Sequence, residues 1–120
     1  MTNIELKALR QLLALECSEA AEHIGNVSTR SWQRWEDGSR PVPDDAAIKI
    51  NYYAQIRNSL IDRQIENAKH NKDAKIDLRF YLSVDEYQQT SGDQQRDVVM
   101  WKITNSVAGH CFSAGIANLI

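Results

Sequence analysis

The sequence predicts a mainly α protein, a helical bundle with a long fourth helix and a small C-terminal extension that contains a strand. Two observations carry this. Apolar residues recur at helical spacing through the first 70 residues, whereas residues 76–82 alternate with period two and are rich in aromatics. With 120 residues, 42% of them hydrophobic, the chain suits one domain, or a small module plus an extension.

Composition excludes several classes of protein. No apolar run approaches the ~18 residues of a membrane span, and the N-terminus MTNIELKALR lacks the form of a signal peptide, so we expect a cytoplasmic protein without membrane contact. Cys17 and Cys111 lie far apart with no CxxC, and the three histidines are scattered. We therefore expect reduced thiols, no metal site and no cofactor.

Capping signals divide the first 40 residues into three helices. Thr2-Asn3-Ile4-Glu5 is a capping box that opens the first, and a second short helix is predicted at about residues 18–24. Gly25-Asn26 should end it, because both residues tolerate positive φ. Ser28 is a good N-cap for a third helix that stops at Asp37-Gly38. The apolar residues of the first helix are Ile4, Leu6, Leu9, Leu12 and Leu13, and Leu15 should close this face.

A long helix follows the connector Arg40-Pro41-Val42-Pro43. Pro43-Asp44-Asp45 reads as its start, with acids near the positive end of the helix dipole, and it should run to about residue 69. At ~1.5 Å per residue it spans about 37 Å, more than a compact small bundle needs. Its apolar stripe consists of Ile48, Tyr52, Ile56, Leu60 or Ile61, Ile65 and Ala68.

The polar residues 70–74 mark the expected boundary between two domains, 1–70 and 71–120. Beyond it we predict a strand over 76–82, a short helix opened by a second capping-box pattern at 83–86, a loop at 90–93 and a helix over 94–108. The apolar tail, 111–120, could pair with the strand.

The segment VSTRSWQRWEDG, residues 27–38, carries the candidate function. Trp32 and Trp35 are three residues apart, so they share a helix face, which we expect in the core. The remaining side chains then lie on other faces, and those expected to point outward are Thr29, Arg30 and Arg34. A short helix, a tight turn and a helix with a polar outer face make a helix-turn-helix, which fits the DNA major groove.

Residues 4–40 resemble the helix-turn-helix of the lambda-repressor-like (Xre) regulators. The matching elements are Leu9-Arg10, Ala21 four residues before Gly25, Val27-Ser28, and Trp35-Glu36 followed by Gly38. The resemblance implies a lambda-repressor-like bundle in which Arg10 and Glu36 form a structural ion pair. It also implies base contacts from Thr29, Arg30 and Arg34, and DNA-backbone contacts from Ser28, Gln33 and Arg40.

This sequence departs from the family pattern at three positions. Asn26 is an extra residue in the turn, Cys17 replaces a polar residue that is often Gln, and Glu16 replaces a Ser or Thr cap. Glu16 and Glu19 near the expected phosphate path should weaken nonspecific affinity for DNA.

The whole chain resembles a small group that includes the YdiL-type proteins and anti-CRISPR-associated autorepressors. This resemblance implies a homodimeric transcriptional regulator whose C-terminal part pairs the subunits. We expect a repressor that reads an inverted repeat in double-stranded DNA with helix 29–37.

Other functions remain open to different degrees. We expect no enzyme, because the acid pairs Asp44-Asp45 and Asp85-Glu86 sit at helix starts, and no phosphate loop or nucleophile elbow is present. A protein-binding adaptor or antitoxin-like module is favoured by the net charge of −2. RNA binding is a third possibility. The tyrosines do not form the aromatic stacking motif that marks an RNA-binding module, and we expect them to pack.

Overall fold

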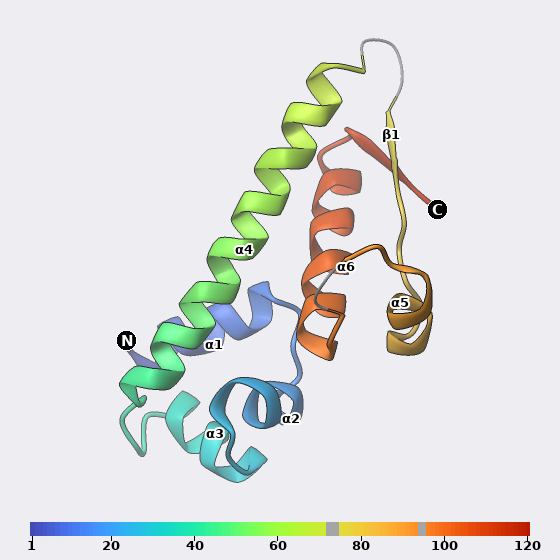
Figure 1. Cartoon of the computed structure of the whole chain (residues 1–120). Coiled ribbons are helices and arrows are strands. Elements are labelled where there is room, and N and C mark those ends of the chain that lie inside the picture. The colour runs from blue at the N-terminus through green and yellow to red at the C-terminus, as the bar shows by residue number, and fades with distance from the viewer. Residues whose placement is uncertain (72–74, 94–95) are drawn as a thin grey trace. The chain divides into compact units, whose positions relative to one another are not determined.

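The computed structural model describes residues 1–71, 75–93 and 96–120. It confirms a mainly α chain with a long fourth α-helix and a small two-stranded sheet near the C-terminus (Figure 1). The elements in chain order are α1 (Asn3–Leu12), α2 (Cys17–Ala20), the π-helical turn η1 (Ala21–Gly25), α3 (Thr29–Glu36), α4 (Asp44–Lys69), β1 (Ile76–Leu78), α5 (Val84–Thr90), α6 (Val98–Ser113) and β2 (Ala117–Leu119).

The chain forms two compact units, residues 1–55 and 56–120, which divide within α4. The predicted division of roles, with DNA binding in 1–70 and subunit pairing in 71–120, stays a prediction. In the described ranges, no helix is long and apolar enough to cross a membrane.

Helix α1 begins as its sequence predicts. The Thr2 hydroxyl accepts a hydrogen bond from the Glu5 amide at 3.1 Å, and the Glu5 carboxylate accepts from the Thr2 amide at 2.8 Å. The bond from the Thr2 amide lowers the pKa of Glu5. The apolar face is narrower than predicted, because Ile4 is 74% and Leu12 40% exposed. Among the predicted leucines, those buried are Leu6, Leu13 and Leu15.

The N-terminal part of α4 also buries a different face from the one predicted. Ile48 and Tyr52 are exposed, whereas Ala46, Ile50 and Ala54 are buried. Residues four apart on a helix share one face, and here that face is built mostly from small side chains. Ile48 and Tyr52, which the sequence pattern placed in the core, are therefore apolar side chains on the surface of this unit.

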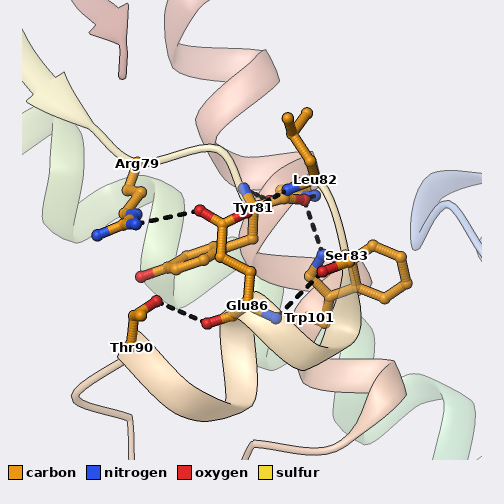
Figure 2. A network of polar contacts seen from close by, with 8 residues as sticks. Arg79, Tyr81, Leu82, Ser83, Glu86, Thr90 and Trp101 are labelled. Atoms are coloured by element: carbon orange, nitrogen blue, oxygen red, sulfur yellow. Dashed lines mark hydrogen bonds and ion pairs between the residues drawn. The ribbon is translucent and has the colours of Figure 1, made fainter.

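The second unit holds a parallel sheet in which Asp77 of β1 is opposite Asn118 of β2. The predicted pairing between strand and tail is confirmed, but β1 ends at Leu78 rather than at residue 82. The Phe80 amide still donates to the carbonyl of Ile120 beyond this strand, and at Tyr81 the backbone groups bond to helix α6 instead. The Tyr81 amide donates to Asn105 Oδ1 at 3.0 Å, and its carbonyl accepts from Trp101 Nε1 at 2.9 Å (Figure 2).

Helix α5 begins with a modified capping box. Ser83 Oγ accepts from the Glu86 amide at 3.1 Å, as predicted, but the Glu86 carboxylate accepts from the amide of Leu82 rather than from that of Ser83 (Figure 2). Glu86 also accepts from Arg79 Nη2 at 3.1 Å, and this bond is the largest of those that lower its pKa.

Helix α6 differs from the predicted helix 94–108 at both ends. It starts at Val98, capped by Asp97, whose carboxylate accepts from the Met100 amide at 2.8 Å, and it continues to Ser113. Residues 94 and 95, where the predicted helix began, lie outside the described residues.

Candidate nucleic-acid interface

The inner face of α3 is formed by the two tryptophans that the sequence placed there. Trp32 is fully buried and Trp35 is 8% exposed, and their rings lie 5.4 Å apart between centroids. Helix α3 packs against α1, α2 and η1 in this unit. Burial of two indoles fixes the rotation of α3 about its axis, and so fixes which side chains it directs outward.

Glu36 at the end of α3 joins α3 to α1. Its two carboxylate oxygens accept from Arg10 Nε at 2.6 Å and from Arg10 Nη2 at 3.0 Å, and it also accepts from the indole N–H of Trp32. Arg10 Nη1 donates to the carbonyl of Leu15 at 2.9 Å. The Arg10–Glu36 pair expected from the sequence is thus present and largely buried, and the hydrogen bond to Glu36 raises the pKa of Arg10.

The two ends of α3 are fixed by polar contacts. Ser28 Oγ accepts from the Ser31 amide at 3.2 Å, the N-cap that the sequence predicts. At the other end Gly38 has a φ of +84°, and Asn3 Nδ2 donates to the carbonyl of Glu36 at 3.1 Å. Sequence reasoning missed Asn3, because a single amide in the first helix carries no motif that points to a helix 33 residues away.

Asn26, which the family resemblance marks as an extra residue, ends a widened helical turn. The amide of Asn26 bonds to the carbonyl of Ala21, five residues earlier, and Asn26 adopts the left-handed conformation with φ 51°. A π-turn holds one residue more than the corresponding α-turn, so the insertion lengthens the end of the helix rather than the loop.

Gly25 is required here for packing rather than for its backbone conformation. The expected positive φ is found at Asn26 and not at Gly25. A Cβ on Gly25 would lie 3.0 Å from atoms of Trp32, Trp35 and Val27. Both indoles therefore pack directly on the backbone of the turn.

The outer face of α3 presents polar side chains. Thr29, Arg30 and Gln33 are exposed, and Arg34 is half-buried. Within the described ranges, no hydrogen bond or ion pair engages the side chain of Arg30 or of Arg34. Unengaged guanidinium groups can donate two parallel hydrogen bonds to a planar acceptor.

Positions on either side of α3 contribute further groups. Ser28 at its start and Arg40 after its end are both exposed. The Arg40 amide donates to the carbonyl of Arg34 at 3.1 Å, which fixes the backbone of Arg40 next to the last turn of α3. Asp37 brings negative charge nearby, although its carboxylate accepts from Ser39, whose hydrogen bonds lower the pKa of Asp37.

The acidic residues of α2 are partly occupied within the helix. The Glu19 carboxylate accepts from the backbone amide of Glu16 at 2.9 Å. Glu19 thus supplies one half of a capping box whose N-cap is Glu16, the residue that stands where the family resemblance implies a Ser or Thr. Cys17, the other departure, is half-buried.

Other polar and titratable side chains have the following contacts in the described part of the chain. There, no group of three or more His, Cys, Asp or Glu side chains is placed to hold a metal ion. The Ser106 hydroxyl accepts from Arg57 Nε at 2.9 Å, and Asp45 accepts from the amide of Ala46 at 2.9 Å.

The features above define a mainly α chain in which a buried tryptophan pair and an ion pair orient an arginine-bearing helix. The chain belongs to the Aca2/YdiL-like family, whose model matches residues 1–120. It is 44% identical over 123 residues to a protein named Aca2 repressor from Pectobacterium phage ZF40, with 100% of each chain covered. It is 28% identical over 120 residues to the uncharacterized protein YdiL of Escherichia coli (strain K12), with 99% of each covered. The whole-chain resemblance predicted from the sequence is confirmed.

Proposed function

We propose that this chain is a sequence-specific regulator of transcription that binds double-stranded DNA as a homodimer. In this proposal α2, η1 and α3 act as a helix-turn-helix, and α3 enters the major groove. One observation carries the proposal. Trp32 and Trp35 occupy the inner face of α3, and the opposite face presents Arg30 and Arg34, whose side chains make no hydrogen bond or ion pair among the described residues.

Each residue of the interface has a proposed role. Arg30 and Arg34 donate bidentate hydrogen bonds to guanine O6 and N7, and Thr29 contacts a base edge from the first turn of α3. Backbone phosphates are held by Ser28, Gln33 and Arg40, which set the register of the helix on the duplex.

A dimer follows from the small size of one reading helix. One bidentate contact supplies ~1–3 kcal/mol of discrimination, too little to select one site in a genome. Two copies related by a two-fold axis double the contacts and read an inverted repeat, with half-sites about 34 Å apart or a multiple of that distance. Exposed apolar residues in both units, such as Ile48 and Leu82, leave surface for subunit contacts.

Repression is the favoured direction of control. The relative that is 44% identical is named a repressor, and a small DNA-binding dimer can repress by occlusion alone. A protein-binding adaptor on the same scaffold is the second candidate, and the net charge of −2 favours it.

Fluorescence anisotropy with labelled duplexes separates the two functions. The probes are a duplex from upstream of the chain's own gene and a duplex of the same length with scrambled sequence, at ~0.15 M salt. We expect the upstream duplex to bind at least ~10³-fold more tightly than the scrambled one. Equal and weak affinity for both duplexes would contradict sequence-specific regulation and leave the adaptor.

A further inference from the structure

Strand β1 has an open edge in the described residues, where the sheet has two strands. On the side of β2, the amides of Ile76 and Phe80 donate to Ile116 and Ile120, and the carbonyl of Leu78 accepts from Ile120. Because backbone groups of successive strand residues face opposite edges, those of Asp77 and Arg79 point away from β2. This edge is defined by residues 76–80 and is called the open edge below.

The sequence of the open edge, Ile-Asp-Leu-Arg-Phe, is complementary to itself in the antiparallel direction. With a two-fold axis at Leu78, Asp77 lies opposite the partner's Arg79, and Ile76 lies opposite the partner's Phe80. Asp77 and Arg79 carry the outward backbone groups, so these positions form the hydrogen-bonded pairs of an antiparallel ladder. The register that pairs the outward backbone groups is therefore the same register that places Asp77 opposite the partner's Arg79.

We propose that β1 pairs antiparallel with β1 of a second copy, about a two-fold axis at Leu78, and joins the two sheets into one. The inference rests on the dimer of the proposed function and names its interface. An isologous contact of this kind needs a surface that complements itself, which this strand provides.

The exposure and contacts of the side chains on the open edge are compatible with a second copy of β1 bound there. Asp77 and Arg79 are exposed, and Phe80 is 38% exposed. Arg79 is held along the edge by its bond to Glu86 and by the ring of Tyr81, 5.5 Å from the guanidinium carbon (Figure 2). A guanidinium has five N–H donors, so Arg79 can bind Glu86 and the partner's Asp77 together. Among the described residues, Asp77 has one long side-chain hydrogen bond, accepted from Asn118 at 3.4 Å.

Exposed apolar side chains also gather near the end of the sheet. Leu82 is 83% and Ile120 67% exposed, and together with Phe80 they line one groove of the second unit.

Charged residues can also protect short edge strands from association. The alternative to self-pairing is therefore that Asp77 and Arg79 prevent a second copy from binding to this edge. Protection works when a second copy meets charges of like sign. Here the register that pairs the backbone groups places an acid opposite a base. The charge pattern of β1 therefore favours self-pairing over protection.

Charge reversal measures the pairing directly. All variants carry Glu86→Gln, because an acid introduced at position 79 would otherwise be repelled by the Glu86 carboxylate. The Glu86→Gln protein is the reference. In that background, sedimentation equilibrium compares Asp77→Arg with the double variant Asp77→Arg and Arg79→Asp. We expect the single reversal to raise the dimer Kd by about tenfold or more, and the double reversal to recover most of the loss. Asp62→Arg, an exposed acid on α4, is the matched control and should leave the Kd unchanged.

Cross-linking gives a second measurement that needs no charged variant. In a Cys17→Ser background, Leu78→Cys places two thiols on the two-fold axis in a non-hydrogen-bonded pair, with Cα atoms about 4.5 Å apart, within disulfide range. Mild oxidation should link this variant as a dimer and leave Gln88→Cys, an exposed position on α5, unlinked. If charge reversal destabilises the fold, this measurement decides.

The outcomes separate the interface from the function. A wild-type dimer that tolerates Asp77→Arg and does not cross-link at position 78 overturns the open edge and leaves the dimeric regulator standing. A wild-type monomer that binds the upstream duplex with a single half-site overturns the interface and the dimer together.

Discussion

Arg10 of α1 and Glu36 of α3 form a bidentate ion pair across 26 residues of sequence, with both side chains largely buried. Glu36 also accepts from the indole of Trp32 within α3, so one carboxylate links α1 to α3 and fixes the inner tryptophan. The direction in which α3 presents Arg30 and Arg34 depends on this interior contact. The pair thus supports the proposed interface without touching DNA.

Replacement of Arg10 by alanine should strongly destabilise the fold. It leaves the Glu36 carboxylate buried without its cationic partner, which costs about 3 kcal/mol of unfolding free energy. Urea denaturation followed by tryptophan fluorescence measures this loss. The double variant Arg10→Ala with Glu36→Gln removes the unpaired charge and should recover part of it. An Arg10→Ala protein as stable as wild type would show that Glu36 is satisfied without Arg10.

Gly25→Ala should destabilise the chain by about 1–3 kcal/mol, because the new methyl group meets both indoles and Val27 at 3.0 Å. Gly109→Ala is the matched control, since a Cβ there meets nothing within 4 Å inside helix α6. It should raise the unfolding free energy by about 0.5–1 kcal/mol. Thermal melting of both variants tests the packing, and two equal shifts would argue against contact between Gly25 and the indoles.

Arg30→Ala and Arg34→Ala should each reduce discrimination between the upstream and scrambled duplexes by about 1–3 kcal/mol while the protein stays folded. The reason is the loss of a bidentate base contact. Arg63→Ala, an exposed arginine on α4, removes the same charge elsewhere and should leave discrimination intact. Full discrimination in both α3 variants would remove these residues from the list of base contacts.

Arg40→Ala should weaken binding to both duplexes alike and reduce the slope of log K against log salt by about one. A phosphate contact releases a counterion whatever the sequence of the duplex, so specificity should not change. Titrations at several salt concentrations measure the slope. An unchanged slope would exclude Arg40 from the phosphate contacts.

Local sequence was enough to predict where the helices of the first unit begin and which face of α3 is buried. Capping chemistry at Thr2-Glu5 and at Ser28 acts within four residues, and the spacing of Trp32 and Trp35 fixes their common face. The Arg10–Glu36 pair was expected only from the family resemblance, because periodicity does not say which helices meet.

Tertiary structure alone decided the remaining features. Gly25 is needed because a side chain there would meet both indoles, and not because its φ is positive. The π-turn that ends at Asn26 was likewise visible only in the structure. The sequence pattern also did not indicate that Ile48 is exposed while Ile50 is buried, or that β1 ends at Leu78. Short-range hydrogen bonds and helical spacing can be derived from neighbouring residues, whereas burial and close packing are set by side chains that the linear sequence does not place together.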